Sequence, residues 1–131
     1  MAHVNFDGLN LWITLDRAER RAIHMPEVVV PRANFAAVAY VPDVWSYVRP
    51  GFGVRGIGYP GILLWGTAYD DDGRDFCVLD QTKPGLILWL NDYPYLRVML
   101  SMPATEAWPL YARLREVISE DIHRRNAGVT G

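Results

Sequence analysis

Apolar and polar residues alternate over several short stretches of the first hundred positions, which is the pattern of half-buried β-strands. In the clearest stretch, residues 9–16, every second residue is apolar. Short apolar runs bounded by proline, glycine, asparagine or aspartate predict further strands at residues 27–30, 35–41, 62–69, 75–80, 86–90 and 96–101. The runs at 27–30 and 35–41 are expected to pair with each other. Because the connections are short, we expect an antiparallel meander rather than alternating strands and helices.

The remaining regular segments have a helical period. Asp16 is a good cap for a short helix up to residue 24, with Ala18, Ala22 and Ile23 facing inward. Asp43 similarly caps a single turn at residues 44–48. From about residue 105 the chain predicts one amphipathic helix, regular from residue 108 because Pro109 suits only a first turn, and ended by Gly128. Its expected inward stripe is Trp108, Tyr111, Leu114, Ile118 and Ile122, widened by Leu110 and Val117.

Together these elements predict a mainly β fold: about seven strands in a partly open antiparallel barrel, capped by the C-terminal helix. The chain has 131 residues and 50% are hydrophobic, which suits one domain over residues 1–131 and excludes the disordered class. Its longest uncharged apolar run, residues 59–69, is shorter than the ~20 residues of a membrane-spanning helix. Residues 1–8 lack a basic segment followed by an apolar one, so we expect no secretory signal and a cytoplasmic location.

Several short motifs resemble those of a family of small, uncharacterised bacterial proteins with a pleckstrin-homology-like (PH-like) fold. They are residues 20–24 before the second strand, GIGYPG at 56–61, GRDF at 73–76, and the final strand running into the helix. The resemblance covers residues 9–117. The sequence departs from the family pattern at Pro109 and in the aromatic segment 45–59. It implies a PH-like fold and brings no catalytic residues with it.

The segment that stands out most is rich in glycine, with five of the 11 glycines at residues 51–61. It contains G-x-G-x-x-G, but a proline precedes it and a strand follows, whereas a dinucleotide site needs a strand before and a helix after. The backbone there either loops freely or passes close to another part of the chain. One hypothesis is a loop that holds a small anionic or amphipathic ligand; the alternative is that its aromatic residues only cover the barrel end. The candidate ligand-binding residues are Trp45, Tyr47, Arg49, Phe52, Arg55 and Tyr59.

Two other groups of residues are candidates for binding. A solvated helix face is the main interpretation of Arg17, Arg20, Arg21 and His24. Because clustered arginines suit phosphate, the same residues are an alternative anion site. Five tryptophans exceed the needs of a small core, which makes Trp12, Trp65 and Trp89 candidates for an interface.

The sequence offers no metal site, cofactor site or catalytic group. The three histidines are scattered, the acidic turn at residues 70–75 lacks the spacing of a calcium loop, and the single cysteine, Cys77, sits in a strand pattern as a buried apolar residue. A net charge of −2 argues against a nucleic-acid partner.

We therefore expect a non-enzymatic binding or assembly module that associates with itself or with a protein partner through an edge strand or an aromatic face. The alternative is a binder of a small molecule or lipid headgroup that uses the loop at residues 45–59. The two hypotheses differ in what the chain recognises, another polypeptide or a small anionic or amphipathic ligand.

Overall fold

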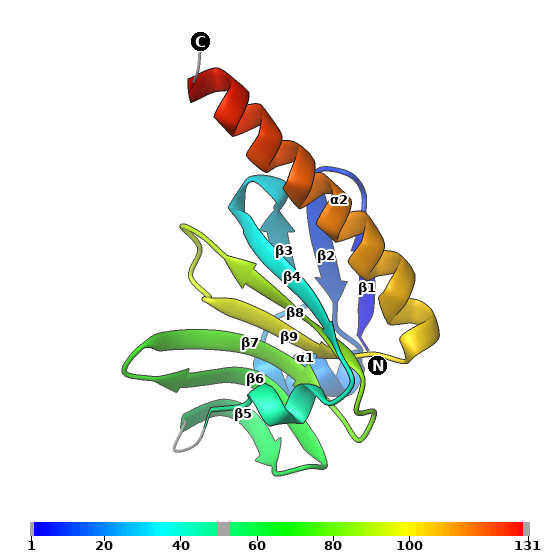
Figure 1. Ribbon diagram of the computed structural model, residues 1–131. Helices are drawn as coiled ribbons and strands as arrows, with labels where there is room; N and C mark the ends of the chain where they lie inside the picture. Colours follow the sequence, from blue (N-terminus) through cyan, green and yellow to red (C-terminus); the bar gives the residue numbers. More distant parts are fainter. Residues whose placement is uncertain (1, 50–52, 130–131) are drawn as a thin grey trace.

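The computed structural model describes residues 2–49 and 53–129 (Figure 1). Within this part of the chain lie two α-helices, α1 (Arg17–Ile23) and α2 (Ala104–Val129), and two 3-10 turns, η1 (Arg32–Asn34) and η2 (Val44–Tyr47). The same residues form nine strands: β1 (His3–Phe6), β2 (Asn10–Thr14), β3 (Glu27–Pro31), β4 (Phe35–Val41), β5 (Gly53–Tyr59), β6 (Leu63–Asp70), β7 (Gly73–Leu79), β8 (Gly85–Leu90) and β9 (Arg97–Ser101). The prediction of a mainly β fold with one C-terminal helix is confirmed.

The strands form two sheets that do not close into a barrel. β1, β2 and β3 make a three-stranded antiparallel sheet, and the six-stranded sheet has the order β4-β8-β9-β7-β6-β5. The prediction of a barrel with about seven strands is therefore wrong, and β1 and β5 are the strands that the sequence pattern missed. The predicted pairing of β3 with β4 is also wrong, because Pro31 and η1 turn the chain out of the first sheet and into the second.

One strand pair is parallel, against the prediction of a wholly antiparallel arrangement. β9 lies between β7 and β8, antiparallel to β8 but parallel to β7. The connection at residues 80–84 therefore spans two strand spacings, about 10 Å. The Asp80 N–H donates to Ser101 Oγ at 3.0 Å, and the Met102 N–H donates to the Pro84 carbonyl at 2.9 Å, which holds this connection over the end of β9.

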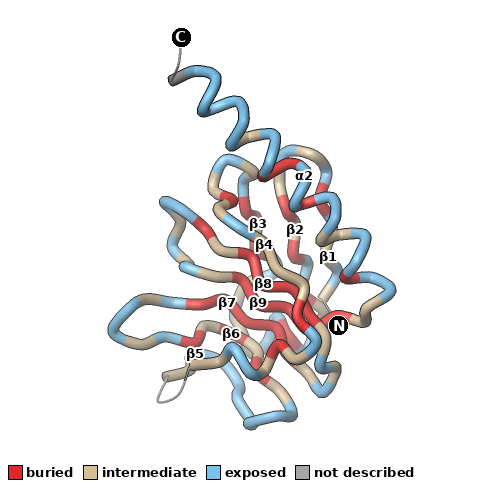
Figure 2. Tube along the Cα trace, viewed as in Figure 1, coloured by how far each residue is buried: buried red, intermediate tan, exposed pale blue. Residues whose placement is uncertain are grey.

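The centre of the six-stranded sheet is buried on both faces, so β7 and β8 are almost continuously apolar. One face, with Phe76 and Val98, packs against the three-stranded sheet and α2. The other face, with Cys77 and Ile87, is covered by Val44 of η2 and by the residues that follow η2. Figure 2 shows the buried residues concentrated in these central strands.

α2 is regular from Ala104 rather than from residue 108, and it buries the middle of the predicted stripe but not its ends. It starts at Ala104 and continues through Pro109 and Gly128; the missing N–H of a proline removes one helical hydrogen bond close to the helix start. Trp108 and Ile122, which were predicted to face inward, are exposed. The helix packs mainly along β4, as Figure 1 shows. Contact with one strand buries a narrower stripe of the helix surface than contact with the end of a barrel would bury. The buried residues of that stripe are Ala107, Leu114, Val117 and Ile118.

Candidate functional site

A hollow of about 950 Å³ lies between the end of α1, the β5–β6 pair and the start of β7. We call it the cationic hollow. Its apolar lining comes from the end of α1 and the residue after it, through Ala22, Ile23 and Met25. The side chains that line it and can donate hydrogen bonds are His24, Arg55, Thr67, Tyr69, Arg74 and Tyr95.

The strand register places four of these donors on one face of the sheet. Arg55 lies opposite Thr67, and Arg74 lies opposite Tyr69. Thr67 and Tyr69 are two positions apart on β6, so their side chains point to the same face. Tyr69 has Arg74 of β7 beside it on one side and Gly53 of β5 on the other. Because Gly53 has no side chain, it leaves room for the Tyr69 ring. The two arginines therefore flank β6 on the face that α1 partly covers.

α1 positions the histidine. The Asp16 carboxylate accepts from the Glu19 N–H at 2.9 Å and the Glu19 carboxylate accepts from the Asp16 N–H at 2.8 Å, a reciprocal cap that confirms the predicted helix start. The helix ends at His24, whose φ of 65° turns the chain and whose N–H donates to the Arg20 carbonyl at 2.8 Å. The inward residue is Glu19, and its burial raises its pKa, whereas Ala18, predicted to face inward, is exposed.

The other members of the alternative anion site point to solvent. Arg17, Arg20 and Arg21 are exposed, and their spacing places them on one face of α1. Of that group, His24 lines the cationic hollow. The hollow thus joins one residue from each predicted site, His24 and Arg55, with neighbours that the sequence did not single out.

The charge inside the hollow is unbalanced. Within the described residues, the guanidinium groups of Arg55 and Arg74 make no hydrogen bond or ion pair. Two carboxylates also line the hollow, but Asp70 lies 3.0 Å from a guanidinium nitrogen of Arg49 and accepts from two turn N–H groups. Only the exposed Asp71 is left to offset the two arginines there.

The predicted ligand loop is divided between two places. Trp45 packs on the face of the sheet that carries Cys77, and its Nε1 donates to the Asp80 carbonyl at 2.7 Å. Arg49 lies 3.2 Å from the buried carboxylate of Asp75. These two side chains therefore hold a covering segment against the sheet. Of the two, Trp45 is an aromatic residue that covers, as in the alternative interpretation, but it covers a sheet face and not a barrel end.

The rest of that predicted group does not join them. Tyr47 is exposed, and its carbonyl accepts from Arg97 at 3.2 Å. Phe52 lies outside the described residues. Arg55 and Tyr59 belong to β5, where Arg55 reaches the cationic hollow and Tyr59 is exposed.

The three tryptophans predicted for an interface are all half-buried. Trp12 Nε1 donates to the Asp7 carboxylate at 2.8 Å, and Trp65 and Trp89 pack against the two cores. The most exposed tryptophan of the described chain is instead Trp108, which stacks on Tyr40 with ring centres 4.6 Å apart.

β5 is an edge strand, so of the two alternatives for the glycine-rich backbone, a free loop or a close approach, residues 53–59 adopt the close approach, with Gly56 opposite Gly66. All seven of its residues pair with β6, and no strand of the described chain lies on its other side. Glycine can join such a ladder because strand pairing uses backbone groups alone. Residues 55–59 are all exposed, and Tyr59, at 60%, is among the most exposed apolar residues. The signal that could have revealed the strand is the alternation of larger residues at 55, 57 and 59 with glycine at 56 and 58.

No protein-family model, curated protein or solved structure matches this chain. Its function is therefore inferred from its own residues. In residues 2–49 and 53–129, no three His, Cys, Asp or Glu side chains are grouped as a metal site would require, and no helix there is long and apolar enough to cross a bilayer. Burial raises the pKa of Cys77 to about 12, so it stays a protonated thiol, as expected for a packing residue.

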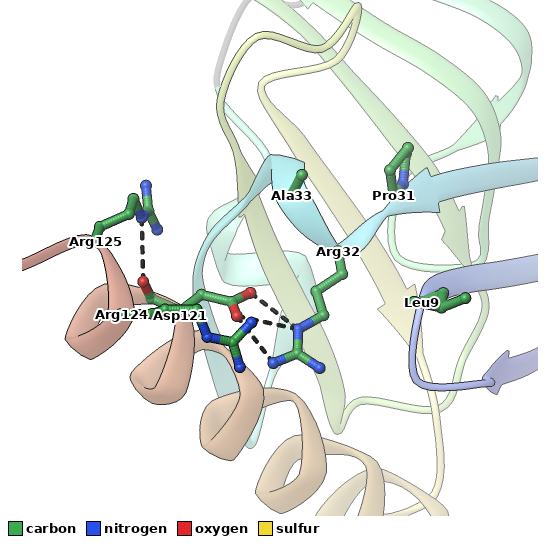
Figure 3. A pocket seen from close by; sticks show the side chains of 7 residues that line it. All are labelled: Leu9, Pro31, Arg32, Ala33, Asp121, Arg124 and Arg125. Atoms are coloured by element: carbon green, nitrogen blue, oxygen red, sulfur yellow. Dashed lines mark hydrogen bonds and ion pairs between the residues drawn. The ribbon is translucent and has the colours of Figure 1, made fainter. Parts of the chain in front are cut away.

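A second hollow, of about 530 Å³, lies where α2 passes η1 and the residue before β2 (Figure 3). Its most enclosed cation, Arg32, is already paired: Nε lies 3.0 Å and a terminal nitrogen 2.9 Å from the two oxygens of Asp121. Glu120 lies 3.1 Å from the same guanidinium. Most N–H donors of this guanidinium already contact Asp121 and Glu120, so few remain for a ligand. We therefore interpret the group as a structural contact that holds the C-terminal half of α2 against η1.

Replacing Asp121 with asparagine is expected to lower the free energy of unfolding by about 1 kcal/mol at neutral pH. The hydrogen bonds from Arg32 lower the pKa of Asp121 from 3.8. Its contribution is therefore present above pH 3.8 and is lost as the pH falls through the lower folded-state pKa. Urea unfolding across acidic pH should show the variant converging on the wild type, while the exposed Glu116→Gln on α2 changes little. A difference that persists at the lowest pH would contradict this assignment.

Proposed function

We propose that this chain is a non-enzymatic assembly module in which β5 pairs with β5 of a second copy, extending the six-stranded sheet across a two-fold axis. The observation that carries the proposal is the exposure of five consecutive residues on β5, a strand whose outer edge has no partner within the described residues. Natural proteins usually protect such edges with charge, proline or a covering segment, because open backbone groups invite another strand. β5 has one charge, Arg55, and no proline.

The sequence of β5 is self-complementary in an antiparallel pair centred on Gly56. That register sets Tyr59 opposite Gly53 and Val54 opposite Gly58 of the second copy, so both of these side chains meet a glycine. Arg55 then lies opposite Ile57 rather than opposite the second Arg55, which limits repulsion between like charges. Two-fold dimers of this kind are the commonest homo-oligomers.

Changing Ile57 to lysine is expected to raise the dimer dissociation constant by about tenfold or more, because the new ammonium would sit beside Arg55 of the second copy. Sedimentation equilibrium would measure the constant. The matched control is Ile62→Lys, which adds the same charge at an exposed isoleucine in the turn after β5 and should leave the dimer intact.

Two outcomes would oppose the proposal. A wild-type chain that stays monomeric over the whole concentration range would exclude self-pairing and leave the edge to a strand from another protein. Equal weakening by both lysine variants would point to a general effect of charge rather than to pairing at β5.

The PH-like resemblance belongs to the same proposal. It is supported by the mainly β fold and by β9 running directly into the C-terminal helix, as the matching motifs require. In a binding module of this kind, recognition by an edge strand needs no catalytic group.

A further inference from the structure

We propose that the cationic hollow binds a soluble organic phosphate, with Arg55 and Arg74 holding the phosphate group. This inference does not rest on strand pairing, because it concerns the face of the β5–β6 pair and not its open edge.

The first argument is the availability of the two guanidinium groups. Neither Arg55 nor Arg74 has an ion pair within the described residues, so both guanidinium groups are available to a ligand. They extend from β5 and β7, which are separated by β6 alone, and they are offset by two residues along the strands, so their bases stand about 12 Å apart on the diagonal. Side chains of this length on one face can converge on a single group between them.

The second argument is the set of neutral donors between them. On β6, Thr67 lies beside Arg55 and Tyr69 lies beside Arg74, and Tyr95 and His24 line the same hollow. A phosphate monoester carries a charge of about −1.5 to −2 and three acceptor oxygens, which two guanidinium groups and adjacent hydroxyl groups can satisfy. A single carboxylate would be satisfied by one guanidinium and would leave the second unpaired.

The third argument is size and polarity. The hollow, at about 950 Å³, is far larger than inorganic phosphate and lies within the range of pockets that hold organic ligands. One wall is apolar, formed by Ala22, Ile23 and Met25. The site therefore suits a ligand with a phosphate at one end and an apolar or aromatic body at the other.

Isothermal titration calorimetry with phenyl phosphate, inorganic phosphate and benzoate tests the proposal. Phenyl phosphate is expected to bind more tightly than either of the others. Arg55→Met and Arg74→Met should each weaken its binding by about tenfold or more, since each removes a charge-assisted contact. Neither guanidinium group has an ion pair or hydrogen bond within the described residues, so both variants should fold. Arg115→Met, which removes the same charge from an exposed position on α2, should bind as the wild type does.

Several outcomes would overturn the assignment. They are absence of phenyl phosphate binding to the wild type, wild-type affinity in both arginine variants, or benzoate binding as tightly as phenyl phosphate. Inorganic phosphate binding as tightly as phenyl phosphate would remove the role of the apolar wall. Binding to phosphatidate vesicles without binding to phenyl phosphate would assign the site to a lipid headgroup instead. Ile57→Lys should still bind phenyl phosphate, which separates this test from that of strand pairing.

Discussion

Replacing Asp75 with asparagine is expected to lower the free energy of unfolding by about 3–5 kcal/mol, measured by urea denaturation. Asp75 is 2% exposed, and its carboxylate lies 2.6 Å from a guanidinium nitrogen of Arg97 and 3.2 Å from one of Arg49. Asparagine keeps the shape but removes the charge. Arg97, whose side chain is 12% exposed, would then lose the carboxylate it pairs with, whereas Arg49 would keep its contact with Asp70. An unpaired buried charge is far more costly than a missing surface pair.

The matched control is Asp72→Asn in the neighbouring turn. The Asp72 side chain is 85% exposed and lies 3.7 Å from the same Arg49 side chain, so its loss should cost less than about 0.5 kcal/mol. Similar losses in the two variants would show that net charge, rather than the buried contact, determines the effect.

The same substitution should also loosen the covering segment. Arg49 anchors that segment to Asp75, and Cys77 lies beneath it in the core that Val44 and Trp45 complete. The thiol of Cys77 should therefore react faster with a disulfide reagent in the Asp75 variant than in the Asp72 control. An unchanged rate would mean that packing alone holds the segment in place.

The sequence predicts most local elements of this fold because each depends on residues close together in the chain. Asp16 and Glu19 provide the cap that starts α1, and alternation over residues 9–16 marks β2. The partners of the strands depend instead on distant residues. β9 lies between β7 and β8 because the connection at 80–84 is anchored to Ser101 and Met102, and no local pattern reports that contact.

The candidate site was predictable only in part for the same reason. Arg55 and His24 were each predicted as binding residues, but in two separate sites. They line one hollow only because α1 packs on the β5–β6 pair. Arg74 belongs to the GRDF motif but carried no signal for binding, because one arginine in an acidic turn looks like an ordinary solvated charge. Its place opposite Tyr69 follows from the register, which forms only when the sheet does.

The substitution Gly66→Ala is expected to abolish stable folding or to lower the free energy of unfolding by more than about 3 kcal/mol. Gly66 on β6 lies opposite Gly56 on β5, and the two have φ angles of 137° and 134°, a region that side chains rarely adopt. A Cβ on Gly66 would also overlap the backbone carbonyl of Arg55. Backbone cannot move aside as a flexible side chain can, so strain and overlap add together and β5 would separate from β6.

The control for this prediction is Gly58→Ala on the same edge strand. Its φ is outside the strained region, and a Cβ there would meet only side-chain atoms of Leu64 and Val54 at 3.5–3.8 Å, which is ordinary contact. Circular dichroism and urea unfolding should show a change below about 1 kcal/mol for this variant. If the Gly66 variant were equally stable, the close approach of the two strands at Gly56 and Gly66 would be excluded. The open edge of β5 depends on that approach, because β5 is held in the sheet by β6 alone.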